Sequence, residues 1–172
     1  MSRYQVRPAT LRDAKAIAQV HVASTQAAFK GLVPDEYLKS ISLEKSQSYW
    51  REAVDLCEPQ VLVATVDDAV VGFVGFDRSR DKATPATTGE IWAIYAKPDL
   101  WGTGLGVALW EAARDGLVEE GCTKVTLWAL WRDERVLSFF GEAGFKVDKG
   151  SARTTDMGGS KLEEIRLQRS IV

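Results

Sequence analysis

Apolar and polar positions divide the chain into a helical first part and a later part in which strands and helices alternate. Over residues 11–29 apolar residues recur at helical spacing, and a glycine and a proline soon follow. Residues 34–54 predict further helix in one or two pieces, with Ser42 as a new N-cap. A short alternating run, Gln5–Arg7, predicts a strand ahead of the first helix.

The later part opens with two apolar, β-branched runs separated by two aspartates, a pattern that predicts a hairpin over residues 60–76. A polar loop over 77–88 follows it. Further strands are predicted at 90–96, 124–130, 145–147 and 162–167, the last two joined across Met157-Gly158-Gly159, and helices at 107–120 and 134–143. This order predicts an α/β protein with a sheet of mixed direction and helices on both faces.

Composition narrows the class of protein. The 172 residues include 22 Lys and Arg against 24 Asp and Glu, a length and composition typical of one domain over 1–172. A balance so close to neutral argues against a nucleic-acid partner. The longest apolar runs are far shorter than the twenty or so residues of a membrane span, and the first ten residues lack a signal sequence. We therefore expect a cytoplasmic protein without a membrane partner.

Two cysteines and a single histidine provide no metal-ligand spacing and no disulfide framework, so no metal is expected. The most informative segment is instead a turn with glycines at 102, 104 and 106, between a predicted strand and a predicted helix. The unpaired amides at a helix start, together with the helix dipole, favour a bound phosphate. The spacing is neither a Walker loop nor the dinucleotide fingerprint. A tight turn without a ligand is the alternative.

Two stretches of the chain resemble the motifs of the GNAT N-acetyltransferase family. The loop Trp101-Gly-Thr-Gly-Leu-Gly106 resembles motif A, Arg/Gln-x-x-Gly-x-Gly/Ala. Residues 132–145, Arg-Asp-Glu-Arg-Val-Leu-Ser-Phe-Phe-Gly-Glu-Ala-Gly-Phe, resemble motif B, often Asn-x-x-Ala-x-x-Phe-Tyr-x-x-x-Gly-Phe. Residues 6–13 also look like a GNAT start, and residues 29–37 and 158–165 resemble segments of one bacterial branch. The resemblance spans essentially the whole chain.

The resemblance implies the GNAT fold, a mixed central sheet of about six to seven strands flanked by about four helices and splayed between two central strands. Acetyl-CoA, the implied co-substrate, would lie in the splay with its pantetheine paired to the backbone of Ile94 and Ala96. A primary amine, on a small molecule or a peptide, would approach from the other side, and a homodimer is common among relatives. The pyrophosphate would meet the loop residues Gly102, Thr103, Gly104, Leu105, Gly106 and Val107.

This sequence departs from the family pattern at three positions of the cofactor site. Trp101 stands at the Arg/Gln position of motif A, although the loop amides remain available for pyrophosphate. Asp133 replaces the motif B asparagine and accepts hydrogen bonds only. Phe140 replaces the motif B tyrosine, a frequent general acid, so the thiolate is expected to leave without a protein acid.

Glu90 is the predicted general base. It precedes Trp101 by eleven residues, the spacing at which the histone acetyltransferase branch of the superfamily places its catalytic glutamate. Strand alternation predicts one face for Glu90, Trp92, Ile94 and Ala96, opposite to Tyr95. An amine with a pKa of about 10.4 must lose a proton before it attacks, and a carboxylate in an apolar setting, its pKa raised, can accept that proton directly or through water. The alternative is a solvated glutamate at a strand start.

Five residues are candidates for the acceptor pocket. His21 is a candidate pocket residue or base. The alternative is that it is only a polar residue at the edge of a packed helix. Trp92 and Trp128 are candidates for an aromatic pocket or for contact with a cationic amine. The alternative is that both are simply core residues. Thr25 and Phe29, at the end of the first helix, are the remaining candidates.

The predicted function is acetyl transfer from acetyl-CoA to an amine by direct attack in a ternary complex, because no Cys–His or Ser–His arrangement supports a covalent intermediate. The first alternative is a non-catalytic acyl-CoA sensor or interaction module on the same fold. An acetyltransferase of tRNA-linked amino groups is a further alternative, against which the near-neutral charge argues.

Overall fold

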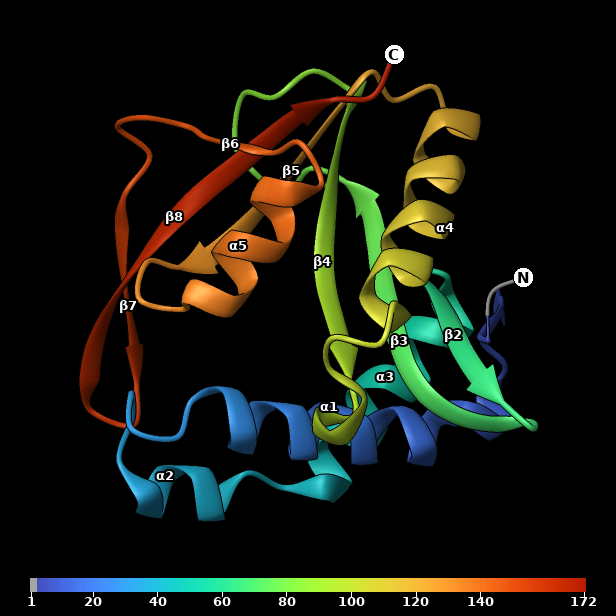
Figure 1. The fold of residues 1–172 in the computed structure, drawn as a ribbon, viewed down its shortest axis with the longest axis vertical. Coiled ribbons are helices and arrows are strands. Elements are labelled where there is room, and N and C mark those ends of the chain that lie inside the picture. The colour runs from blue at the N-terminus through green and yellow to red at the C-terminus, as the bar shows by residue number, and fades with distance from the viewer. Residues whose placement is uncertain (1–2) are drawn as a thin grey trace.

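The computed structural model describes residues 3–172, and its centre is one sheet in the strand order β1-β2-β3-β4-β5-β8-β6, with β7 paired to β8 (Figure 1). All neighbouring strands are antiparallel except β4 and β5. The strands are β1 (Gln5–Pro8), β2 (Gln60–Val66), β3 (Ala69–Arg78), β4 (Thr88–Ala96), β5 (Lys124–Leu130), β6 (Lys146–Val147), β7 (Arg153–Met157) and β8 (Ser160–Ser170).

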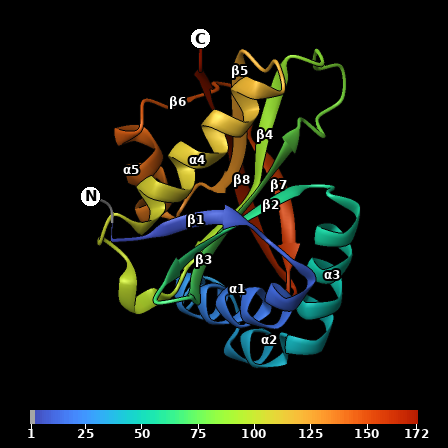
Figure 2. The same ribbon diagram turned by 90° about the vertical axis from the view of Figure 1, so that its right-hand side faces the viewer.

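Five α-helices flank this sheet, and α1 to α3 group together away from α4 and α5 (Figures 1 and 2). They are α1 (Ala14–Ala28), α2 (Asp35–Ser40), α3 (Leu43–Leu56), α4 (Leu105–Glu119) and α5 (Glu134–Glu142), with short 3-10 turns at Leu11–Asp13 and Pro98–Leu100. Ser42 caps α3, as predicted, because its hydroxyl accepts a hydrogen bond from the Lys45 amide.

Two hydrophobic clusters cover the two faces of the sheet. Beneath α4 and α5 lie Leu109, Phe140 and their neighbours, and on the other face Ile17 and Trp50 pack from α1 and α3 onto Phe73. A third, smaller cluster joins α2 and the end of α1 to the β7–β8 hairpin. Among residues 3–172, no helix is both long and apolar enough to cross a membrane.

The central strands β4 and β5 pair over a short distance only. Their parallel register covers Thr88–Glu90 and Lys124–Thr126, after which the two strands diverge. In Figure 1, β5 and β8 lean away from β4 toward its C-terminal end. The predicted splay between two central strands is therefore present.

One extra residue sits in β4 at Trp92. Phe76 of β3 pairs with Ile91, whereas the preceding Gly75 pairs with Ala93, so Trp92 has no partner in the register. This two-against-one count is a β-bulge, which bends a strand and changes its twist.

The bulge changes which side chains share a face. Ile94 and Ala96 pack with Ile91 in the cluster beneath α4, whereas Tyr95 packs toward α1 and α3. Because Glu90 alternates with Ile91, it lies on the face of Tyr95. The prediction of a single face for alternate residues from Glu90 to Ala96, opposite to Tyr95, is wrong, since it assumed an unbroken strand.

The observed elements extend the predicted ones at two places. Within residues 3–172 the mixed sheet has eight strands where about six to seven were expected, and five α-helices flank it where about four were expected. The missed strand, Arg153–Met157, is the hairpin partner of Ser160–Ser170 across Gly158 and Gly159. It is a polar, mostly exposed strand and therefore lacks the apolar alternation that identifies a strand in the sequence.

Candidate active site

Two cavities meet in the splay between β4 and β5. One, of about 370 Å³, lies between the loop that leads into α4 and the side chains of α5. The other, of about 260 Å³, lies between the end of α1, β4, β5 and the β7–β8 hairpin. The two cavities share part of their lining, namely Ile94, Tyr95, Ala96, Trp101, Arg135, Val136 and Phe140.

The glycine loop forms the floor of the cavity beside α4. Gly102 and Gly104 have φ angles of 78° and 89°, a left-handed backbone that favours glycine. Gly104 is the N-cap of α4, so the amides of residues 105–107 lack helical partners and are available to a ligand. A Cβ on Gly106 would lie 3.0 Å from the Phe139 ring, which explains the third glycine by close packing.

The predicted loop residues contribute in different ways. Gly102, Gly104, Gly106 and Val107 line the cavity. Leu105 lies in the core beneath α4, so only its backbone is available to a ligand. The Thr103 hydroxyl donates to the Leu100 carbonyl at 2.5 Å and lies 2.5 Å from the Tyr4 hydroxyl, so this side chain braces the loop.

Arg135 is a functional candidate that the sequence analysis missed. Its guanidinium lies 3.8 Å from the centre of the Trp101 ring and lines both cavities. Burial lowers the pKa of Arg135, and the nearby Asp133 opposes that shift. Trp101, which replaces the family's Arg/Gln, thus supports a cation supplied by α5. The signal in the sequence that could have identified Arg135 was its place near the start of the motif B segment.

The edge of β4 presents backbone groups to the splay. The Lys97 amide donates to Val71 of β3, so the adjacent Ala96 directs its own polar groups away from β3. By the antiparallel alternation, Ile94 does the same. The Ala96 carbonyl already accepts hydrogen bonds from the Ser24 hydroxyl at 2.5 Å and from the Trp101 indole at 3.1 Å. Ile94 is therefore the less occupied of the two predicted pairing residues.

Glu90 is buried at the closed end of the splay, with 1% of its side chain exposed. The Arg80 guanidinium donates to both of its oxygens, from Nη2 at 2.6 Å and from Nε at 3.3 Å. The Arg80 amide donates a third bond, at 2.9 Å. The carboxylate is thus paired rather than isolated in the apolar setting that was expected. Its three bonds leave one acceptor position, on the oxygen that accepts from Nη2, for an incoming proton.

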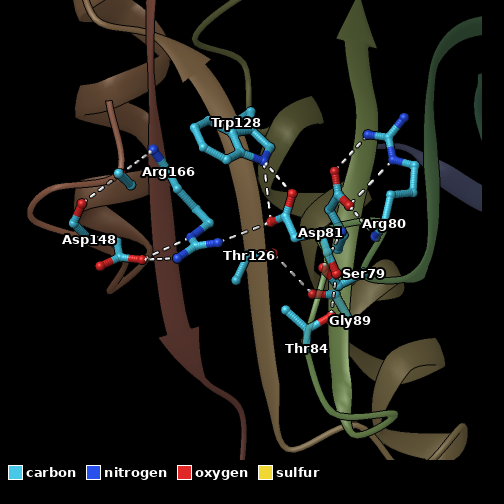
Figure 3. Close-up of polar contacts among 11 residues, drawn as sticks. Ser79, Arg80, Asp81, Thr84, Gly89, Thr126, Trp128, Asp148 and Arg166 are labelled. Atoms are coloured by element: carbon cyan, nitrogen blue, oxygen red, sulfur yellow. Dashed lines mark hydrogen bonds and ion pairs between the residues drawn. The ribbon is translucent and has the colours of Figure 1, made fainter. Parts of the chain in front are cut away.

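Arg80 belongs to the loop between β3 and β4, and a polar network fixes this loop across the splay (Figure 3). The Asp81 carboxylate accepts from the indole of Trp128 on β5 at 3.0 Å and from Arg166 on β8 at 3.2 Å. Arg166 also pairs with Asp148. We call residues 79–87 the strap, because they connect β4 to the strands beyond the splay and deliver Arg80 to Glu90.

Arginines stack on both predicted pocket tryptophans. The guanidinium of Arg80 lies 4.3 Å from the ring centre of Trp92, and that of Arg153 on β7 lies 3.7 Å from that of Trp128. Both tryptophans line the smaller cavity, as does Phe29 at the end of α1. The sequence analysis did not identify either arginine, because each comes from a segment remote in the chain.

His21 and Thr25 do not line either cavity and so depart from their predicted place in the acceptor pocket. His21 faces α3, where its Nδ1 lies 2.8 Å from the Ser46 hydroxyl, and burial lowers its pKa. Thr25 is buried beside Tyr95, whose pKa is raised by burial and partly lowered by that hydroxyl. The helical spacing did not determine where either side chain points: His21 turns toward α3, and Thr25 turns toward Tyr95 of β4.

Asp133 and Phe140 occupy the motif B side of the splay. Asp133 is the N-cap of α5, and its carboxylate accepts from the Val136 amide at 3.2 Å. Phe140 lines both cavities and packs its ring against Trp110 and Phe145 with only 1% of the residue exposed. A hydrocarbon ring therefore stands where the family often places a tyrosine.

Comparison with known proteins agrees with this geometry. The profile of the Acetyltransferase (GNAT) family matches residues 27–145. The "uncharacterized N-acetyltransferase YuaI" of Bacillus subtilis (strain 168) is 25% identical over 163 residues, which cover 94% of this chain and 90% of that protein. The chain belongs to the GNAT acetyltransferase family, as predicted.

Solved structures share the whole architecture. The PaiA N-acetyltransferase of Thermoplasma acidophilum, crystallised in complex with coenzyme A, superposes with a TM-score of 0.79 at 21% identity and with 99% of each chain covered. The ribosomal-protein-alanine N-acetyltransferase of Brucella melitensis superposes with a TM-score of 0.76 at 19% identity, with 96% of this chain and 99% of that chain covered. The predicted fold class is confirmed.

Proposed function

We propose that this protein transfers an acetyl group from acetyl-CoA to a primary amine by direct attack within a ternary complex. The observation that carries the proposal is the pair of cavities that meet in the splay, one beside the glycine loop and one beside Glu90. A pair of adjoining sites allows both substrates to be present at once.

The residues beside α4 fit coenzyme A. The amides of residues 105–107 and the Arg135 guanidinium suit a pyrophosphate, because both offer donors to an anion. Ile94 offers backbone groups to an extended pantetheine chain. The complex of the Thermoplasma relative with coenzyme A supports this assignment. When bound, acetyl-CoA supplies the activated thioester.

The residues of the smaller cavity serve the amine. The amine nitrogen attacks the thioester carbonyl, the carbon–sulfur bond breaks, and Glu90 accepts the proton released by the nitrogen, directly or through water. The backbone around Ile94 to Ala96 orients the carbonyl. Phe140 cannot donate a proton, so the thiolate leaves as an anion and takes a proton from solvent. A thiol pKa of about 8.5 makes that departure feasible.

The decisive experiment measures thiol release from acetyl-CoA over a panel of amines, amino acids, polyamines and aminated antibiotics. Turnover above background with at least one class supports the proposal. Tight binding of coenzyme A by calorimetry with no turnover on any amine would favour the non-catalytic sensor instead. The missing tyrosine at position 140 is the observation that keeps the sensor as the competing function.

A further inference from the structure

The faces of the two pocket tryptophans meet arginines of the protein itself. Arg80 stacks on Trp92 and Arg153 stacks on Trp128 at 4.3 and 3.7 Å from the ring centres. A cationic substrate therefore competes with a guanidinium for these rings. This arrangement argues against the expected contact between the tryptophans and a cationic amine.

The carboxylates that line the same cavity already have partners. Glu90 is held by Arg80, Glu164 accepts from Nε of Arg153 at 3.3 Å, and Asp133 caps α5. Within the described residues 3–172, the lining thus offers no carboxylate without a partner to a second ammonium group. A polyamine would find few sites for its remaining charges.

Arg153 has donors to spare. Its side chain is 50% exposed, and its Nε alone makes a hydrogen bond within the described part of the chain. Both Nη groups remain for a ligand in the cavity that Arg153 lines. Arg80 differs, because it spends Nε and Nη2 on Glu90. A guanidinium with a vacant edge is suited to bidentate binding of a carboxylate or another oxyanion.

The position of Arg153 is set before any ligand binds. The Arg153 guanidinium stacks on the Trp128 ring, and the Trp128 indole is fixed in turn by a hydrogen bond of 3.0 Å to Asp81 of the strap. The far end of the hairpin is seated on α2, where a Cβ on Gly158 would lie only 2.6 Å from Tyr37. Such preorganisation reduces the entropy lost on binding.

We propose that the amine acceptor also carries an oxyanion, as an α-amino acid or an aminophosphonate does, and that Arg153 binds this group. The proposal rests on the proposed function, whose acceptor class it narrows. With the oxyanion on Arg153 at the β7 wall, the amine extends toward the splay, where Glu90 and the thioester site lie. Arg153 is then the residue that determines specificity for the acceptor.

The experiment compares amines in matched pairs that differ only in the acid group, such as phenylalanine with phenethylamine and methionine with 3-(methylthio)propylamine. An aminophosphonate of each pair tests the second kind of oxyanion. Thiol release from acetyl-CoA gives kcat and KM for the wild type, for Arg153→Gln and for Arg153→Lys. The matched control is Arg51→Gln, which alters an exposed arginine of α3 outside both cavities.

Arg153→Gln is expected to raise KM for the acids by about 10- to 100-fold, the effect of losing a charge-assisted hydrogen-bond pair. No such rise is expected for the decarboxylated amines, because the same change frees the Trp128 ring and Glu164 for a cation. Arg153→Lys should recover part of the loss. Preference of the wild type for the decarboxylated amines or for polyamines would overturn the proposal. An equal loss on acids and amines in Arg153→Gln would do the same.

Calorimetry on the coenzyme A complex separates this inference from the proposed function. If no compound is turned over but the acids bind and Arg153→Gln abolishes that binding, the oxyanion site stands and catalysis fails. If neither acids nor aminophosphonates bind, the site is refuted even where another amine is acetylated.

Discussion

The buried Glu90 carboxylate forms an ion pair with Arg80 and lies at the closed end of the splay. Substitutions can separate its proposed role as a base from a structural role in the ion pair. Glu90→Gln should lower kcat by about 100-fold or more while the affinity for acetyl-CoA stays unchanged. The loss should be largest at low pH, where the fraction of free amine is smallest and a base is needed most. Rates measured between pH 6 and 9 check this expectation.

Arg80→Gln is the matched control for Glu90→Gln, because it removes the partner and keeps the carboxylate. A base at Glu90 predicts a milder loss in Arg80→Gln, with the pH dependence retained. If the two variants lose the same activity at every pH, the ion pair is structural and Glu90 is not the base.

Arg135, stacked on Trp101, places a cation beside the loop where the family's motif A has Arg or Gln. Arg135→Gln should raise KM for acetyl-CoA by about tenfold or more, the worth of a hydrogen bond to a charged group, with kcat little changed. Initial rates at varied acetyl-CoA measure this. Arg132→Gln, three residues earlier, exposed and outside both cavities, should behave as the wild type.

Among the elements, the turn into α4 depends on the backbone of Gly104. A Cβ there would meet no atom within 4 Å, so contact with neighbouring atoms is not what requires a glycine. The φ of 89° is the constraint instead, and Gly104→Val should cost about 1–2 kcal/mol and displace the loop amides. Calorimetry with coenzyme A should show weakened binding. Gly141→Ala, a helical glycine with open space, should bind normally.

The Asp81 carboxylate ties the strap to Trp128 and Arg166 on the far side of the splay. Asp81→Ala removes the hydrogen bonds to Trp128 and Arg166 and so should loosen residues 79–87. Hydrogen exchange of these amides should quicken severalfold, and kcat should fall as Arg80 is released. Asp99→Ala, at an exposed position outside both cavities, is the control. Unchanged exchange in Asp81→Ala would show that the strap needs no such anchor.

Sequence patterns predicted elements that bury apolar side chains, among them α1, α4 and the strands β2 to β5. They missed β7, because the edge strand Arg153–Met157 carries mostly polar side chains. They also missed the bulge at Trp92, because one extra residue leaves no mark in composition. The glycine loop was found through its own residues, whereas Arg80, Arg135 and Arg153 reach the cavities through tertiary packing that spacing alone does not encode.

For the molecule as a whole, acid should reduce stability through His21. Burial between α1 and α3 lowers the pKa of His21 below its usual 6.5, so the unfolded chain binds the proton more readily. Its contribution to stability is therefore intact well above pH 6.5 and is lost as the pH falls below that value. His21→Asn removes this dependence. Denaturant unfolding at pH 7.5 and 5.5 should show a smaller loss in the variant, and equal losses would contradict the expectation.

The two cavities also have a kinetic consequence under the proposed function, since different segments line them beyond their shared wall: the glycine loop and α4 for one, the end of α1 and the β7–β8 hairpin for the other. The two substrates are therefore expected to bind from different sides, so that neither product blocks the exit of the other. Double-reciprocal plots should give intersecting lines rather than parallel ones. Free coenzyme A should compete with acetyl-CoA but not with the amine. A bulky amine should bind more slowly without slowing the binding of acetyl-CoA.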